Sequence, residues 1–160
     1  MATTNLSSPD QLLHLQLRTA LTMEDDSLAA LGVLAKAAKS QKVKKMFSHH
    51  ADETREQIDN LHKVFKLLDL KQTTAPSPST KGISKQAESL IKKTDASLHD
   101  QVVLSSALGN EHYEIASYMG LIVPVTAMGL SDVLALLQSN LDQETHTSEE
   151  LKAELERIAA

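Results

Sequence analysis

The chain has 160 residues, of which 41% are hydrophobic and 2% aromatic, with a formal net charge of -5 and an isoelectric point near 5.8. This length suits one domain with a substantial core, and the absence of cysteine excludes disulfides, thiolate metal sites and redox thiols. The acidic balance argues against nucleic acid as a partner, because no long basic run occurs beyond Lys42, Lys44 and Lys45.

The first eight residues are small and polar, and we expect them to form a flexible N-terminus ahead of a single domain over residues 9–160. Residues 1–10 lack the charged and apolar segments of a secretory signal, and no run approaches the roughly 18 to 20 apolar residues of a membrane span. The sequence therefore predicts a cytoplasmic protein with no membrane partner.

The first half of the chain shows the apolar spacing of two long helices. Ser8 followed by Pro9 is a cap with proline at the first helical position, so we expect a helix that reaches about Ala38. A second helix is predicted from near Ser40 or Gln41 to about Asp69. The short connection between them makes these helices antiparallel neighbours.

A linker follows, because residues 70–82 are rich in Thr, Pro and Ser, and Pro76 and Pro78 exclude a regular helix there. A short amphipathic helix ending near Thr94 comes next. Together these segments are long enough to form a crossover connection along a bundle.

Two further long helices complete the domain. The third spans about 97–128, with Asp95 or Ser97 as its cap, and Ser131 is predicted to cap a fourth that continues to about Ile158. The fold class is therefore all-α, a four-helix bundle with a short extra helix in the crossover between the second and third long helices.

A glutamate interrupts the apolar stripe of each long helix at a position where leucine is expected. These residues are Glu24, Glu53, Glu111 and Glu144. Each lies about a dozen to sixteen residues from either end of its helix, so all four fall at one height in the bundle. Buried ionised carboxylates are costly unless they are neutralised, and a bundle that supplies one from every helix follows the plan of di-iron carboxylate proteins.

Further candidate ligands lie one helical turn from these glutamates. They are His50, Glu56 and Glu114, and His49 and His112 are weaker candidates for nitrogen ligation. A site built mostly from oxygen donors favours hard ions such as manganese, iron(III), magnesium or calcium over zinc.

A structural explanation stays open beside the metal site. Arg18 and Arg55 lie within reach of the stripes and could each compensate one carboxylate, although not four. For Tyr118, which shares the apolar face of the third helix, core packing with a satisfied hydroxyl is favoured over a redox role.

The stretch from Asn110 to Leu121, which contains Glu-His-Tyr-Glu-Ile-Ala-Ser-Tyr, resembles the signature of the YciE/YciF family of bacterial ferritin-like proteins. Residues 47–58 and 136–144 also resemble that family. The resemblance implies a ferritin-like bundle, a homodimer and an association with bacterial stress responses. The chain departs from the family at Leu21, where relatives can carry Tyr, and at Ser148, where Asp is expected.

The resemblance also implies metal binding by the four stripe glutamates, with Glu56 and Glu114 completing rubrerythrin-like pairs. Two functions stay open. The first is a di-metal protein that binds one or two iron or manganese ions and, if it is an enzyme, acts as a ferroxidase or a peroxidase-like oxidoreductase. The second is a non-catalytic stress-associated or partner-binding bundle with a vestigial metal site.

Overall fold

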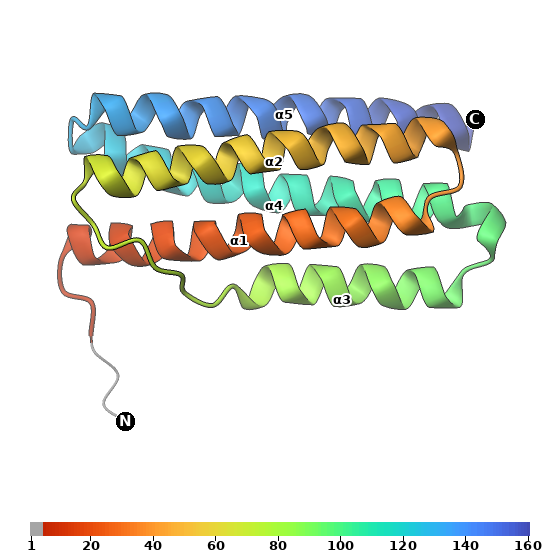
Figure 1. Ribbon diagram of the computed structural model, residues 1–160, viewed down its shortest axis with the longest axis horizontal. Helices are drawn as coiled ribbons and strands as arrows, with labels where there is room; N and C mark the ends of the chain where they lie inside the picture. Colours follow the sequence, from red (N-terminus) through yellow and green to blue (C-terminus); the bar gives the residue numbers. More distant parts are fainter. Residues whose placement is uncertain (1–4) are drawn as a thin grey trace.

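Five α-helices and one short 3₁₀ helix occur in residues 5–160, the part of the chain that the computed structural model describes. Their bounds are α1 Pro9–Ala37, α2 Gln41–Leu67, α3 Pro78–Lys93, η1 Ala96–Leu98, α4 His99–Ala127 and α5 Ser131–Ala159. Four of them, α1, α2, α4 and α5, form a bundle, and α3 lies outside it against α1 and α4 (Figure 1). The predicted all-α bundle with an extra crossover helix is confirmed.

Each bundle helix runs antiparallel to the two helices that it packs against (Figure 1). The hairpins α1–α2 and α4–α5 have short connections, whereas the chain between α2 and α4 returns along the length of the bundle through α3. This crossover makes α4 start at the same end of the bundle as α2, so the middle of every long helix reaches the same level.

Side-chain caps start the first two helices, and the first of these caps was predicted from the sequence. Ser8 accepts a hydrogen bond from the backbone N–H of Gln11 at 3.2 Å, and Ser40 accepts one from Val43 at 3.2 Å. These bonds satisfy backbone donors that lack a partner inside the helix. We predicted a flexible N-terminus over residues 1–8, of which residues 1–4 lie outside the described part of the chain.

Three local expectations were wrong. Pro78 begins α3 instead of excluding it, because a proline at the first helical position lacks only a donor that would have no intrahelical partner. Asp95 caps η1, not α4, by accepting from the Ser97 backbone N–H at 2.9 Å. Ser131 is the first residue of α5, and Leu130 holds the cap position without a side-chain bond.

Two clusters of buried apolar side chains fill the two ends of the bundle. One contains Leu13, Leu17, Leu61, Phe65, Val125 and Leu137, and the other contains Leu31, Leu34, Phe47, Val103, Leu104 and Leu151. Burying a side chain of this size contributes about 1.5–3 kcal/mol. Apart from Glu154, the buried polar residues of the long helices fall between the two clusters, so the apolar ends hold a polar middle layer in place.

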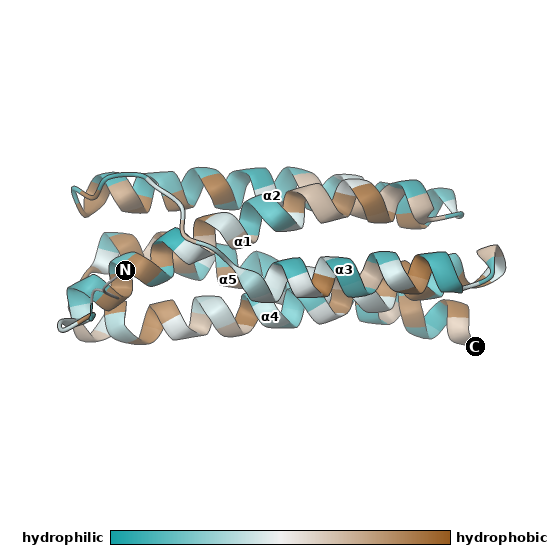
Figure 2. Cartoon of the chain, turned by 90° about the horizontal axis from the view of Figure 1, so that it is seen from below, coloured by the Kyte–Doolittle hydropathy of each residue, from teal (hydrophilic) through white to brown (hydrophobic). Residues whose placement is uncertain are grey.

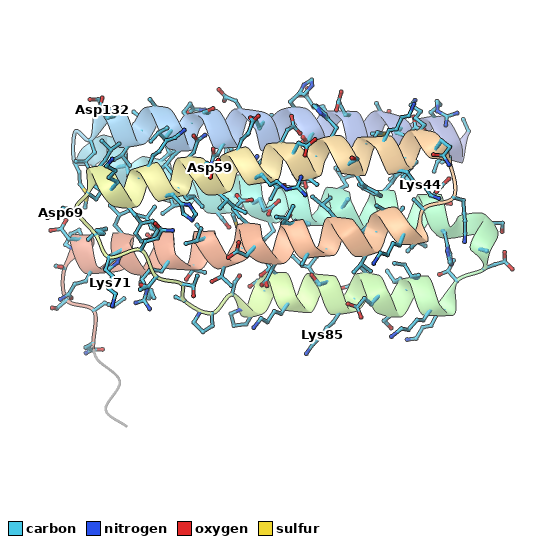
Figure 3. The ribbon with its side chains drawn as sticks, in the orientation of Figure 1. Lys44, Asp59, Asp69, Lys71, Lys85 and Asp132 are labelled. Carbon is cyan, nitrogen blue, oxygen red and sulfur yellow. The ribbon has the colours of Figure 1, made fainter. Side chains whose placement is uncertain are left out.

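The outer faces carry the charge. Asp59, Lys85 and Asp132 point away from the bundle (Figure 3), and hydrophilic and hydrophobic residues alternate along the helices (Figure 2). In residues 5–160 no helix combines the length and the apolar character needed to cross a membrane.

We predict that Glu154 stabilises the bundle at neutral pH. Its buried carboxylate pairs with Arg157 at 2.6 Å and with Lys42 of α2. The hydrogen bonds from Arg157 outweigh the effect of burial and, with Lys42, lower the pKa of Glu154 to about 2. A carboxyl whose pKa is lowered on folding contributes stability above its unfolded pKa of about 4.3, and this stability is lost as the pH falls towards 2.

Chemical denaturation of Glu154→Gln beside the wild type should therefore show a loss of about 1 kcal/mol in the free energy of unfolding at pH 7, because both partners are exposed. The difference should shrink to nothing near pH 2. An equal difference at both pH values would show that the ion pairs do not cause it.

Candidate metal centre

The middle of the bundle contains a layer of ionisable side chains that are almost completely removed from solvent. The exposed fractions are 0% for Glu24, 2% for His50, 1% for Glu111, 0% for Glu114 and 0% for Glu144. They come from α1, α2, α4 and α5, so every bundle helix contributes at least one. Glu111 and Glu114 share a face of α4 because three residues make most of one helical turn.

Four of these side chains converge on one point. His50, Glu111, Glu114 and Glu144 each offer a ligand atom, and these atoms all lie within 4.8 Å of one another. Three carboxyl groups and one imidazole at this separation form a ligand set that could hold a metal ion.

His50 is the cation of this group. Its Nε2 lies 2.8 Å from Glu111 Oε1, and its Nδ1 lies 3.4 Å from Glu53 Oε2. Burial lowers the pKa of His50, but the charge and hydrogen bond of Glu111, helped by Glu53, raise it to about 10. In the metal-free protein at neutral pH, His50 is therefore an imidazolium that donates from both ring nitrogens.

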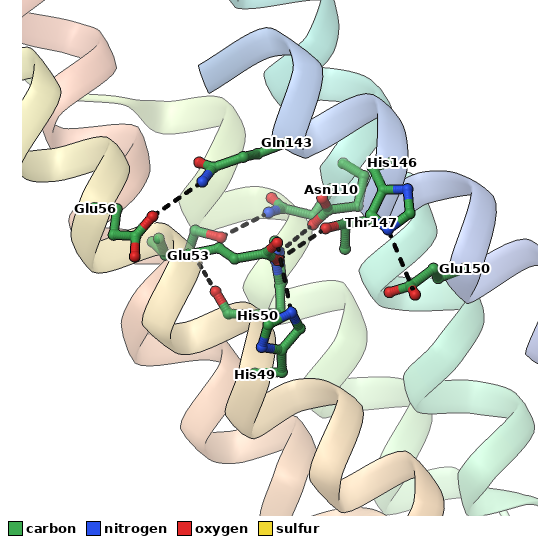
Figure 4. Close-up of polar contacts among 12 residues, drawn as sticks. His49, His50, Glu53, Glu56, Asn110, Gln143, His146, Thr147 and Glu150 are labelled. Carbon is green, nitrogen blue, oxygen red and sulfur yellow. Dashed lines mark hydrogen bonds and ion pairs between the residues drawn. The ribbon is translucent and has the colours of Figure 1, made fainter. Parts of the chain in front are cut away.

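Glu53 links the buried layer to the surface. Its side chain is 15% exposed, and its Oε2 also accepts a hydrogen bond from Thr147 Oγ1 at 3.1 Å (Figure 4). Burial raises the pKa of Glu53, but the hydrogen bonds from His50 and Thr147 lower it below its ordinary value. Glu53 thus stays ionised beside His50.

Glu24 is held on one side by a buried tyrosine. The Tyr118 hydroxyl donates to Glu24 Oε1 in a short hydrogen bond and accepts from Asn140 Nδ2 at 2.9 Å. Asn140 also donates to the backbone carbonyl of Gln57 at 3.2 Å, which ties α5 to α2. Burial, opposed by the Tyr118 hydrogen bond and reinforced by Glu111, raises the pKa of Glu24 to about 8.

Most of the carboxylate oxygens in this layer have no hydrogen-bond partner. The buried atoms without one are Glu24 Oε2, Glu111 Oε2, both oxygens of Glu114 and both oxygens of Glu144. Burial and the neighbouring carboxylates raise the pKa values of Glu114 and Glu144 well above the ordinary value. A single imidazolium cannot neutralise this set, so protons or a bound cation must complete it.

The structure separates the remaining predicted ligands from this group. Glu56 is exposed on α2 and accepts from Gln143 Nε2 at 3.1 Å, away from the buried atoms (Figure 4). His112 is exposed on α4, and His49 is 69% exposed with its Nε2 3.7 Å from Glu53 Oε1. Glu24 and Glu53 are in the polar layer but outside the group of four converging atoms.

The arginines that could have explained the buried charge bind elsewhere. Arg18 donates to the carbonyl of Thr74 at 2.9 Å, and Arg55 pairs with Asp52 at 2.6 Å. Neither arginine is therefore the partner of a stripe glutamate.

Several buried polar residues around the site were not predicted from the sequence as ligands or as hydrogen-bond partners. Asn140 and Thr147 occupy buried positions on α5 four residues before and three residues after Glu144, and Gln57 is buried on α2. A polar side chain at a core position of a helical pattern was the available signal. Their partners across the bundle could not be inferred from it.

The donor set fits the metal ions that the sequence indicated. Carboxylate oxygens are hard ligands, and one imidazole nitrogen beside several of them suits iron or manganese. The unpartnered buried oxygens are the observation that supports this fit, because a cation would supply the positive partner that they lack.

The fold and the buried histidine–carboxylate layer define a helical-bundle protein with a candidate metal centre. A family model described as "Domain of unknown function (DUF892)" matches residues 8–160, so the chain belongs to this family. The protein is 29% identical to Protein YciF of Escherichia coli (strain K12) over 140 residues, which are 86% of this chain and 84% of YciF. The resemblance to the YciE/YciF family is thereby confirmed.

Solved structures agree with this assignment. YcfI from Rhodopseudomonas palustris superposes with a TM-score of 0.91 at 27% identity, over 95% of this chain and 98% of that protein. The crystal structure of the E. coli stress protein YciF gives a TM-score of 0.89 at 26% identity, over 94% and 96% of the two chains. The predicted ferritin-like bundle fold of this family is therefore confirmed.

We predict that removing one buried carboxyl stabilises the metal-free protein at high pH. An acid whose pKa is raised on folding binds more protons in the folded than in the unfolded state, so the free energy of unfolding falls as the pH rises above about 4.3. For Glu144 the pKa is raised well above its ordinary value, first by burial and then by Glu114 and Glu111.

Glu144→Gln should therefore raise the free energy of unfolding of the metal-free protein by about 1–2 kcal/mol at pH 8 and change it little at pH 4. The matched control is Glu150→Gln, an exposed position on the same helix, which should have little effect at either pH. Urea titrations of protein dialysed against chelator measure all four values. A Glu144→Gln protein that is less stable than the wild type at pH 8 would contradict the assigned electrostatics.

Proposed function

We propose that this protein binds one or two iron or manganese ions in the middle of the bundle and uses them to oxidise Fe(II) or to consume peroxide. The observation that carries the proposal is the set of buried carboxylate oxygens without partners around a single imidazole. A site meant only for packing would leave such groups hydrogen-bonded or replace them with apolar side chains.

The residues divide the work in the following way. His50 Nε2 and the carboxylates of Glu111, Glu114 and Glu144 would hold an ion, and Glu24 and Glu53, which also lie in the polar layer, would supply further ligands for a second. His50 must release the proton on Nε2 before this atom can ligate, so uptake of an ion releases protons to solvent.

The bound ions would supply electrons, since two Fe(II) ions that each lose one electron reduce one hydrogen peroxide, with two protons, to two waters. The chain's own residues keep the reaction dry and oriented. Tyr118, whose hydroxyl accepts from Asn140, donates to Glu24 Oε1, so that Oε2 is the oxygen without a partner. The apolar clusters at both ends keep bulk water out of the layer.

The proposal includes a cytoplasmic homodimer that acts under stress. The support is the family membership together with E. coli YciF, which is described as a stress protein.

A second function, a non-catalytic partner-binding bundle, is supported by one local feature. At position 148, where the family pattern suggests aspartate, Ser148 donates to the backbone carbonyl of Thr145 at 2.7 Å and supplies no carboxylate ligand. In this alternative Glu114 and Glu144 stay protonated because their pKa values are raised, and no metal ion is needed to neutralise them.

The two functions differ in metal content. Wild-type protein expressed in medium supplemented with iron or manganese should contain about one or two ions per chain, and Glu114→Ala with Glu144→Ala should reduce this below about a tenth of an ion. The matched control is Glu149→Ala with Glu150→Ala, two exposed carboxylates on α5. Mass spectrometry of the metals, with circular dichroism to confirm folding, makes the comparison.

Thermal unfolding gives an independent measure. A free ion at about one hundred times its dissociation constant should stabilise the wild type by about 2.7 kcal/mol, and it should leave the double variant unchanged. Stabilisation of both proteins by the same amount would place the ion elsewhere and favour the partner-binding function.

A further inference from the structure

A small cavity and a wide groove reach the polar layer from different sides of the bundle. The cavity lies between α1, α3 and α4 and includes Glu111 in its wall. The groove lies between α2 and α5 and includes Glu53, Asp142 and His146. The cavity therefore reaches the polar layer at Glu111, and the groove reaches it at Glu53.

The cavity is small and mostly apolar. Its volume is about 30 Å³, and its walls include Ala30, Leu31 and Leu34 of α1, Ile83 and Ala87 of α3, and Ala107 of α4. A single water needs about 10–15 Å³ of such space. The cavity therefore suits a molecule of about two heavy atoms.

The cavity leads from the surface to the site. At its outer side are Val33, which is 42% exposed, and the exposed Glu88. At its inner side is Glu111, which is 1% exposed and whose Oε2 has no hydrogen-bond partner. Between them, Asn110 donates to Ser27 Oγ at 3.1 Å, so these polar groups are mutually satisfied.

The helix that covers the cavity has little other role in the core. Of the residues in α3 only Thr80 and Ala87 are buried. Thr80 donates to Asp26 Oδ2 at 2.8 Å and so fixes the start of α3 on α1, while Ala87 lines the cavity. The alanine side chain leaves the space that a larger residue would fill.

We propose that this cavity binds the small, neutral two-oxygen oxidant, dioxygen or hydrogen peroxide, and delivers it to the Glu111 side of the carboxylate layer. The inference rests on the proposed function, because it concerns the oxidant of that same site. A hydrated divalent cation is a poor occupant, since apolar walls cannot replace its water ligands. The groove beside Glu53, with Asp142 and His146, offers cations the polar approach.

The first test needs no metal. Xenon is an apolar probe for cavities of this kind, and under xenon pressure the methyl NMR signals of Leu31, Leu34 and Ile83 should shift in the metal-free protein. Signals of Leu15, in the uncovered part of the α1–α4 groove, should stay unchanged. Ala30→Leu should abolish the xenon shifts by filling the cavity, and Ala87→Leu fills it from α3 if Ala30→Leu fails to fold. Absence of xenon shifts in the wild type would overturn the proposal.

The second test uses protein loaded anaerobically with Fe(II) and mixed in a stopped-flow instrument with hydrogen peroxide or with dioxygen. Ala30→Leu should slow iron oxidation by about tenfold or more with at least one oxidant, as excess side-chain volume does in a pocket of fixed size, and should leave the bound Fe(II) per chain unchanged. Slowing with peroxide alone assigns the cavity to peroxide, and slowing with both assigns it to either oxidant. The matched controls are Ala116→Leu, in a part of the α1–α4 groove that α3 does not line, and Ala135→Leu in the α2–α5 groove.

The outcomes separate the two proposals. In one outcome the wild type takes up iron, and the iron bound to Ala30→Leu and Ala87→Leu is oxidised at the wild-type rate. This result leaves the metal site in place and overturns the cavity proposal. Slower oxidation only in Ala135→Leu would overturn it in the same way and place the oxidant's route beside Glu53. If the wild type takes up neither iron nor manganese, both proposals fail.

Discussion

Neutralising buried negative charge is the constraint on which the rest of this structure depends. Glu24, Glu111, Glu114 and Glu144 meet in a layer with exposures of 0–1%, and His50 is the one buried cation among them. Carboxylates without partners cost several kcal/mol each in such surroundings. The layer therefore holds protons when it holds no metal, as the raised pKa values of Glu24, Glu114 and Glu144 express, and exchanges them for an ion when one binds.

The bundle tolerates this unfavourable layer because other parts of the helices supply the stability. Apolar clusters pack the helices together on either side of it, and polar contacts between helices fix the side chains within it. The chain from Asn140 through Tyr118 to Glu24 joins α5, α4 and α1, while His50 joins α2 to Glu111. The crossover through α3 brings the middles of all four helices to one level and covers the cavity that reaches Glu111.

The helical periodicity of the sequence was enough to predict the bundle and the buried positions of Glu24, Glu111 and Glu144. Each of these residues lies on the buried face that the apolar residues of its helix mark at a spacing of 3.6 residues. On α2 the same period could not decide between His50 and Glu53, which are three residues apart. The structure buries His50 and leaves Glu53 half-buried. Contacts such as Tyr118 to Glu24 join residues far apart in the chain, and they depend on helix rotations that no local pattern specifies.

The most direct test of the central claim is anomalous X-ray diffraction from crystals soaked in Mn(II) or Fe(II), recorded at the absorption edge of the metal. We predict an anomalous peak within about 2.0–2.3 Å of His50 Nε2 and of carboxylate oxygens from Glu111, Glu114 and Glu144. Such a peak would identify the cation that these buried oxygens lack. An empty polar layer at saturating metal, with the carboxyl groups close enough to share protons, would contradict the account and leave a bundle neutralised by protonation alone.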